Sequence, residues 1–199
     1  TALWSWGDNG NGQLGQTSVI KRSSPVQVGA DTTWSNCFKG SVHSIATKTN
    51  GTLWIWGRNN KGQLGQNDLV DRSSPTQVGS GTTWLSATSN YYSTFAVKTD
   101  GTLWAWGSNQ YGQLGQSNVI YRSSPIQVGA LTTWSQVFGG AYFVTAIKSD
   151  GTLWAWGRNQ NGELGQNNLT YLSSPVQIGA ATTWRGGCDG WYMAFAISS

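Results

Sequence analysis

A gapless 50-residue repeat runs through the whole chain, and it limits the fold more strictly than any other feature. The copies occupy residues 1–50, 51–100, 101–150 and 151–199. Eighteen positions carry the same residue in all four copies, including most of each Leu-Trp-x-Trp-Gly segment. Self-similarity at this period indicates a solenoid, a propeller or an array. We therefore expect a single domain, 1–199, built of four tandem units.

Each copy contains four short segments with the signals of β-strands. Residues 94–98 alternate in polarity, a turn follows at 99–102, and residues 103–106 place two Trp on one face of the next strand. The Asp-Gly pair in the turn favours a type I′ hairpin, in which both central residues have positive φ. Residues 125–128 and 133–138 supply two more strands, and no segment shows a capped 3.6-residue apolar period. Four short strands per repeat are typical of a propeller blade, so we predict an all-β propeller of four four-stranded blades.

The sequence of the repeat is specific enough to suggest a family. The segment GTLWAWGSNQYGQLGQ, followed by SSPIQVG, resembles the regulator of chromosome condensation repeat, and the resemblance covers the whole chain. Residues 40–44, Gly-Ser-Val-His-Ser, match that family's Gly-x-x-His-Ser segment, and the other copies depart from it. The resemblance implies a propeller, usually of seven blades. The Trp-rich segments look most like bacterial and phage surface members of the family, which suggests an extracellular or virion-surface location.

The resemblance also implies how strands are shared among blades. With each blade running from an inner to an outer strand, three blades follow at 50-residue intervals and the fourth is split between the two ends of the chain. Its inner strands come from 184–188 and 193–197, and its outer strands from 3–6 and 25–28. Three arrangements are open: a four-bladed ring closed by one chain, an eight-bladed ring of two chains that exchange half-blades, or part of a longer propeller. A seven-bladed family favours the last two together over the first.

Composition and charge argue against several classes of function. Charged residues make up 10% of the chain and the net charge of +4 is scattered, with Lys21-Arg22 the longest basic run, so no stripe suited to nucleic acid exists. No apolar run approaches the roughly 18 residues of a membrane span. Cys37 and Cys188 are expected to be small buried thiols, and with His43 as the single histidine they make a metal site implausible. No residues are arranged for nucleophilic catalysis, so we expect neither an enzyme nor a cofactor.

The candidate functional residues lie where the copies differ, because positions that vary among the copies are not required to form the shared fold. One such segment joins the two inner strands, at 39–43, 89–93, 139–143 and 189–193. In a propeller these turns gather around one mouth of the central channel, and Tyr and Trp beside Ser, Gly and Asn are typical of adaptable recognition surfaces. The candidates for contact with a ligand or partner are Lys39, His43, Tyr91, Tyr92, Tyr142, Phe143, Asp189, Trp191 and Tyr192.

Other interpretations of the divergent segments stay open. The aromatic residues of the turns can instead pack between blades. A second divergent segment lies in the long loop after each Leu-Trp-x-Trp strand, and we expect it to project at another rim, where a solvated loop is favoured over a contact surface.

The functional prediction is a non-catalytic binding module that recognises a protein or a glycan through aromatic turns, in adhesion or surface display. The regulatory alternative follows from the family's founding member, an exchange factor for a small GTPase, whose basic tail and inserted wedge have no counterpart in these repeats. Light sensing, as in a plant UV-B photoreceptor of the family, is a third alternative, but only Trp191 lies at the relevant segment and no Arg follows it. Expected partners are a protein or glycan ligand and, for the ring, a second copy or a longer parent chain.

Overall fold

The computed structural model describes residues 1–38 and 40–199, and all of their regular elements are β-strands. Three complete antiparallel sheets follow one another: β3 (Trp34–Phe38), β4 (His43–Lys48), β5 (Leu53–Gly57) and β6 (Arg72–Gln77); β7 (Trp84–Ser89), β8 (Ser93–Lys98), β9 (Leu103–Gly107) and β10 (Arg122–Gln127); β11 (Trp134–Gly139), β12 (Phe143–Lys148), β13 (Leu153–Gly157) and β14 (Leu172–Gln177). Two-stranded half-sheets flank them: β1 (Trp4–Gly7) with β2 (Arg22–Gln27), and β15 (Trp184–Asp189) with β16 (Ala194–Ser198). Over these described ranges no helix is long and apolar enough to cross a membrane.

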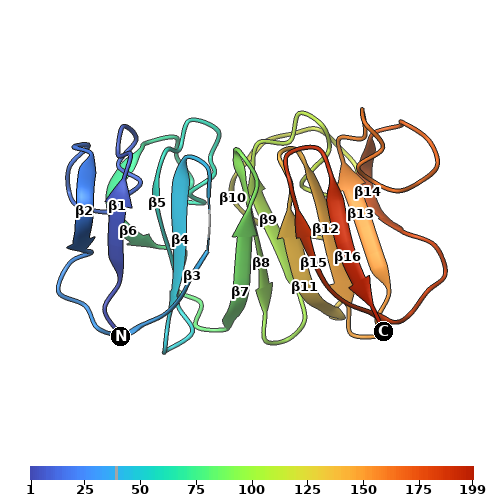
Figure 1. The fold of residues 1–199 in the computed structure, drawn as a ribbon, viewed down its shortest axis with the longest axis horizontal. Coiled ribbons are helices and arrows are strands. Elements are labelled where there is room, and N and C mark those ends of the chain that lie inside the picture. Colours follow the sequence, from blue (N-terminus) through green and yellow to red (C-terminus); the bar gives the residue numbers. More distant parts are fainter. Residues whose placement is uncertain (39) are drawn as a thin grey trace.

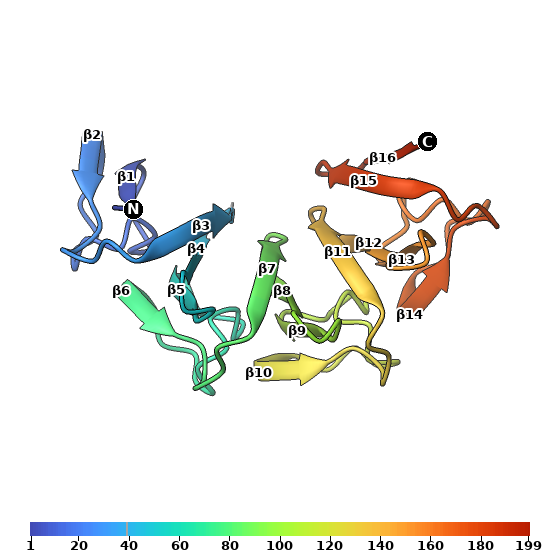
Figure 2. The same ribbon diagram turned by 90° about the horizontal axis from the view of Figure 1, so that it is seen from below.

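The blades stand side by side as an open arc (Figures 1 and 2). The first strand of each blade lies on the inner side of the arc and the last strand on the outer side, as Figure 2 shows. This confirms the predicted four-stranded blades, and it places an outer half-blade at the N-terminal end of the arc and an inner half-blade at the C-terminal end. The two halves do not pair, and they lie at the two ends of the open arc (Figure 2). The structure is therefore not the four-bladed ring closed by one chain.

The hairpin in the middle of each blade differs from the type I′ turn predicted. In the second complete blade the Gly101 N–H donates to Lys98 O (2.9 Å), and the Lys98 N–H donates to Thr102 O (3.0 Å). Only Gly101 has a positive φ, of 78°, whereas Asp100 does not. The loop is thus a three-residue connection with a left-handed glycine at its end. Asp100 favours it by accepting hydrogen bonds from the Thr102 N–H (2.9 Å) and hydroxyl (2.7 Å).

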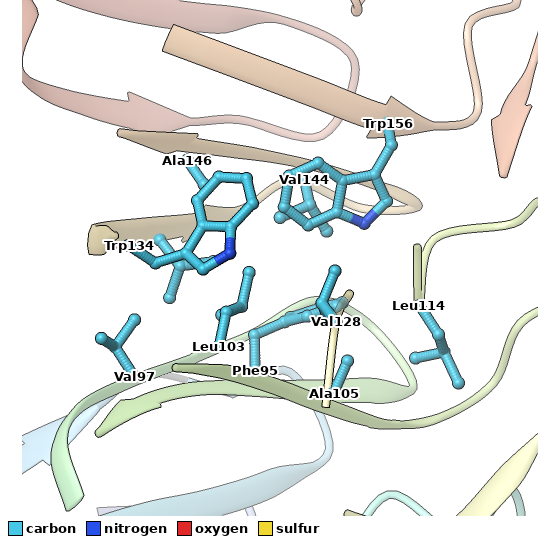
Figure 3. Close-up of a cluster of buried hydrophobic side chains, with 11 residues drawn as sticks. Phe95, Val97, Leu103, Ala105, Leu114, Val128, Trp134, Val144, Ala146 and Trp156 are labelled. Carbon is cyan, nitrogen blue, oxygen red and sulfur yellow. The ribbon is translucent and has the colours of Figure 1, made fainter. Parts of the chain in front are cut away.

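Neighbouring blades pack face to face through large apolar side chains. Between the second and third complete blades, Trp134 and Trp156 lie over Phe95, Val97 and Leu103 (Figure 3). All five side chains are buried. Each Trp contributes roughly 2–3 kcal/mol when fully buried, so these interfaces supply much of the stability of the arc.

Two recurring hydrogen bonds join the long loop of each blade to the next blade. Trp106 Nε1 donates to the carbonyl oxygen of Gln63 in the preceding loop (2.9 Å). The Asn67 N–H, also in that loop, donates to Ser123 O on β10 (2.8 Å), and Asn67 adopts a left-handed φ of 60° to do so. Equivalent bonds recur at 50-residue intervals, which explains why the Trp and Ser-Ser-Pro positions are shared by all copies.

Cys37 and Cys188 are both free and exposed, so the expectation of buried thiols was wrong. Cys37 lies on β3, at the position that Ala87 occupies in the next blade, where it is buried. At Cys37 the inner strands of a preceding blade are missing from the arc, and the thiol is left uncovered.

Candidate functional site

The turns that carry the predicted site share one end of the blades with the long loops. Because neighbouring strands are antiparallel, the turn after the first strand and the loop after the third leave the sheet at the same end. This end is the upper rim in Figure 1, and the chain termini lie at the lower rim. The expectation that the long loops project at another rim was therefore wrong. We call this common end the mouth.

Seven aromatic side chains form one continuous contact network at the mouth, which we call the mouth cluster. Neighbouring ring centroids lie 4.5–6.3 Å apart, and most pairs meet edge to face, the geometry that aromatic quadrupoles favour. The members come from turns of three blades and from long loops: Tyr91, Tyr92, Tyr111, Tyr142, Tyr171, Trp191 and Tyr192.

Arg158 provides a cation in the middle of this network. Its guanidinium lies 5.1 Å from the ring centroid of Tyr192 and 5.8 Å from those of Tyr111 and Tyr142, within cation–π range. Partial desolvation works to lower the pKa of Arg158, but hydrogen bonds to Tyr171 and Tyr192 outweigh it and raise the pKa, so the side chain stays charged. It takes part in none of the ion pairs formed by the described residues.

The structure brings five of the nine predicted site residues together in the mouth cluster. These are Tyr91, Tyr92, Tyr142, Trp191 and Tyr192.

The remaining four candidates have different positions. Phe143 is buried against Ala155 and Leu164, so packing within the blades accounts for it. His43 is also buried. Asp189 lines a cavity beside the mouth cluster, described below, and Lys39 lies outside the described residues.

Three members of the site were missed by sequence reasoning. Tyr111, Tyr171 and Arg158 belong to long loops, which the sequence placed at another rim. A signal did exist, because these positions also differ among the copies: Tyr111 aligns with Asn11, Lys61 and Asn161.

His43 links two blades and does not face the mouth. The Thr94 hydroxyl donates to Gln63 O (2.8 Å), so at 3.0 Å it accepts a hydrogen bond from the Nε2–H of His43. The ring is therefore the neutral Nε2–H tautomer, and Nδ1 has no partner among the described residues. Complete burial lowers the pKa of His43 to about 4. These features indicate a structural role rather than proton transfer or contact with a partner.

A cavity of about 310 Å³ lies on the channel side of the mouth cluster and shares Tyr91 and Trp191 with it. Gly139, Gly140 and other glycines of the turns line it with backbone. Asn90 supplies a buried amide whose Nδ2 has no hydrogen-bond partner in the part of the chain that the structure describes. The cavity can therefore accept a hydrogen-bonding group beside two aromatic rings. No three His, Cys, Asp or Glu side chains gather within the described ranges to hold a metal ion.

Asp189 is the acidic group of this cavity. Burial raises the pKa of its carboxyl to about 7, although Thr145 Oγ1 donates to its two oxygens (3.0 and 3.2 Å) and works in the opposite direction. The unfolded carboxyl titrates near 3.8, so the folded state holds a proton between pH 4 and 7 that the unfolded state releases. The stability contributed by this group is complete below about pH 4 and is lost as the pH rises through 7.

Asp189→Asn should therefore raise the stability at pH 8 by about 2 kcal/mol, after allowance for partial exposure, and should leave it unchanged at pH 4. The Asn Oδ1 still accepts from Thr145, and no charge is buried. Thermal unfolding at the two pH values measures the difference. The control is Asp150→Asn in an exposed hairpin, where hydrogen bonds from Thr152 lower the pKa of the carboxyl, so no gain is expected at pH 8. Equal effects of both substitutions would contradict the assignment.

Comparison with protein-family models identifies the repeat. The model described as "Regulator of chromosome condensation (RCC1) repeat" matches residues 2–47, 50–97, 100–147 and 150–186. A second model with the same description matches residues 86–113 and 134–163. A search of curated protein sequences gave no match.

Solved structures give the same architecture. Human WBSCR16 superposes with a TM-score of 0.87 at 21% identity, over 100% of this chain and 53% of that one. Prp20p from Saccharomyces cerevisiae superposes with a TM-score of 0.86 at 16% identity, over 100% and 52%. Yeast RCC1 (Prp20) bound to Kap60 gives 0.84 at 18%, over 99% and 50%. The chain thus spans about half the length of these proteins and shares their fold.

Proposed function

This chain belongs to the Regulator of chromosome condensation (RCC1) repeat family, and on that premise we propose that it is a non-catalytic binding module that holds a protein partner on the mouth cluster. One observation carries the proposal: seven connected aromatic rings surround a charged Arg158 that forms no ion pair with a described residue. Binding energy at protein interfaces concentrates in Tyr, Trp and Arg, which are the residue types gathered here.

The chemistry of the mouth favours a partner segment with an acidic side chain beside apolar ones. A carboxylate can meet the guanidinium of Arg158 bidentately, and the exposed rings of Trp191, Tyr192 and Tyr171 offer apolar area next to it. The net charge of +4 attracts such a segment over a distance. Edge-to-face packing holds the rings in place, so little conformational entropy is lost on binding.

Known relatives are consistent with a protein partner without identifying it. The structure of Prp20p was reported with its binding properties to Gsp1p and histones, and yeast RCC1 was solved bound to Kap60. At 16–18% identity these likenesses concern the fold, and neither partner is transferred to this chain. Display on a bacterial or virion surface stays a separate proposal. The similar structures described above come from human and yeast proteins, so they do not support a bacterial or phage origin.

A selection experiment tests the proposal. A phage-displayed library of random peptides is selected on the 199-residue chain, and the enriched peptides are measured against variants. We expect Arg158→Gln to weaken binding at least tenfold, about 1.4 kcal/mol, because a charged hydrogen-bond pair is lost. Arg185→Gln, which removes an exposed Arg outside the mouth cluster, should leave the affinity unchanged.

Two outcomes would count against the proposal. Peptides that bind Arg158→Gln and Tyr142→Ala as tightly as the wild type would place the binding surface elsewhere. Binding confined to a glycan array, and lost in Tyr142→Ala, would identify a carbohydrate ligand instead. The regulatory alternative has its own measurement: faster release of a fluorescent nucleotide from a small GTPase would replace the binding proposal with an exchange activity.

A further inference from the structure

A second arginine lies at the mouth, and the proposed function makes no use of it. The guanidinium carbon of Arg58 lies 5.6 Å from the ring centroid of Tyr92, a member of the mouth cluster, which is within cation–π range. Arg58 is half-buried, and it forms no ion pair with any residue that the structure describes. The mouth cluster is therefore in contact with two guanidinium groups, those of Arg58 and Arg158.

The same backbone contact places both arginines. In each complete blade, the first residue of the long loop donates its N–H to a carbonyl of the turn that joins the first two strands. These bonds are Arg58 to Val42 O (3.0 Å), Ser108 to Tyr92 O (2.9 Å) and Arg158 to Tyr142 O (3.0 Å). The bond holds the start of the loop against the turn, so the side chain at this position lies beside the mouth. The fold sets the place of this residue while its charge varies, since the four copies have Asp8, Arg58, Ser108 and Arg158.

A continuous row of rings joins the two arginines. From Arg58 the contacts run to Tyr92, then to Tyr91, with 4.5 Å between the ring centroids, and then to Tyr142, with 6.3 Å. The Tyr142 centroid lies 5.8 Å from the guanidinium carbon of Arg158. All five residues belong to the three complete blades, which follow one another in the arc (Figure 2), and neither half-sheet takes part. The row of rings therefore depends only on packing among complete blades.

The acidic side chains of the neighbouring long loops already have partners. Asp71 accepts a hydrogen bond from a backbone N–H of its own loop (2.7 Å), and Asp68 forms an ion pair with Arg72 (2.6 Å). Glu163 interacts electrostatically with Arg158, but Glu163 is buried and accepts a hydrogen bond from a loop N–H (2.8 Å). The two guanidinium groups at the ends of the row therefore remain open to carboxylates of another molecule.

We propose that the mouth binds an extended protein segment with two carboxylates, one for Arg58 and one for Arg158. The inference rests on the proposed function, to which it adds a second charged contact and a spacing. The side chains between the two carboxylates pack on Tyr91, Tyr92 and Tyr142. A single row of rings matches the alternate side chains of one extended chain. Four contacts of at most 6.3 Å join the two guanidinium groups, so at about 3.3 Å per residue the two acidic residues lie about seven residues apart or fewer.

The surroundings of the two arginines favour a segment with two acidic residues over a segment with one. The rings exclude water from part of each guanidinium, and a carboxylate can accept two parallel N–H bonds from it. A segment with a single acidic residue leaves the other guanidinium beside the rings without a counter-charge. It forgoes half of the charged contacts, so the pair of arginines selects for the spacing of two carboxylates.

Peptides enriched on the 199-residue chain in the selection described above provide the probe. Their sequences should share two Asp or Glu residues at a constant separation of about seven residues or fewer. Arg58→Gln should weaken the binding of such a peptide at least about fivefold, and Arg58→Gln combined with Arg158→Gln at least about fiftyfold. Lys21→Gln is the matched control. It removes one positive charge from an exposed loop at the same end of the blades, and it should change the affinity by less than about twofold.

Neutral versions of the peptide assign each contact. Replacing one acidic residue of the peptide by its amide should weaken binding to the wild type and have no further effect on binding to Arg58→Gln. Replacing the other acidic residue should behave in the same way with Arg158→Gln. Thermal unfolding of both protein variants beside the wild type checks that the blades are intact.

The possible failures separate this inference from the proposed function. If Arg158→Gln weakens binding and Arg58→Gln does not, the second contact is absent and the proposed function stands without it. If both acidic residues couple to Arg158 alone, or their separation varies freely among the peptides, the two-arginine site is overturned as well. If neither substitution changes the affinity, or if no peptide is enriched, both proposals fail.

Discussion

Trp106→Ala should lower the free energy of unfolding by about 3–5 kcal/mol. The indole is fully buried between the first and second complete blades, in a cluster that includes Ile45, Leu53 and Leu64. The truncation removes this contact area, leaves a cavity and takes the hydrogen-bond donor from Gln63 O. Urea unfolding followed by far-UV circular dichroism measures the loss.

Trp191→Ala is the control for this prediction. Trp191 has the same side chain but is 59% exposed in the mouth cluster, so its removal should cost less than about 1 kcal/mol. If the two substitutions destabilised the protein equally, packing between blades would not be the main source of stability. The pair of variants also separates the two uses of Trp in this sequence, because Trp191→Ala should affect binding at the mouth while Trp106→Ala affects folding.

Gly101→Ala should destabilise the protein by about 3–4 kcal/mol, the second largest effect that we expect. Gly101 has φ of 78°, a conformation that costs an L-residue roughly 1–2 kcal/mol. A Cβ there would also overlap the carbonyl oxygen of Thr132, in the segment that leads into the next blade. The overlap is with backbone, so relief requires the two blades to move apart.

Gly129→Ala isolates the conformational part of this cost. Gly129 has a similar φ of 63°, but a Cβ there would meet no described atom within 4 Å. We expect a loss of about 1 kcal/mol, and the difference between the two variants reports the overlap with Thr132. Thermal unfolding of both variants beside the wild type provides the comparison, and equal losses would show that the hairpin does not press on the next blade.

The blades were predictable because their causes are local. Apolar alternation marks each strand, Pro at 25, 75, 125 and 175 marks an outer strand, and Asp-Gly marks the hairpin. The turn type was predicted incorrectly. The Asp100 carboxylate accepts a hydrogen bond from the Thr102 N–H, and the connection has three residues in place of the two of a type I′ turn, so only Gly101 needs a positive φ. That choice depends on side-chain hydrogen bonds, which dipeptide preferences do not contain.

The candidate site was predictable in part. Divergence among copies pointed to Tyr91, Tyr142 and Trp191, and the structure places them in contact. The same criterion applied to Arg158 and Tyr111, but their loops were expected at another rim. Counting strands within an antiparallel blade shows that both connections leave at one end, so the error lay in topology and not in residue choice.

Strand period, turn residues and identity between copies act over short distances along the chain, so the repeat, the four-stranded blade and the variable positions could be inferred from the order of the amino acids. Which side chains meet, and which strand edges stay open, depends on the packing of one blade against the next. Aromatic rings more than 20 residues apart, such as Tyr111 and Tyr142, come together because blade packing sets the rotation between neighbouring sheets. The same rotation keeps β1 and β16 apart. This rotation depends on the summed packing of many side chains across each interface, so no local segment of the sequence determines it.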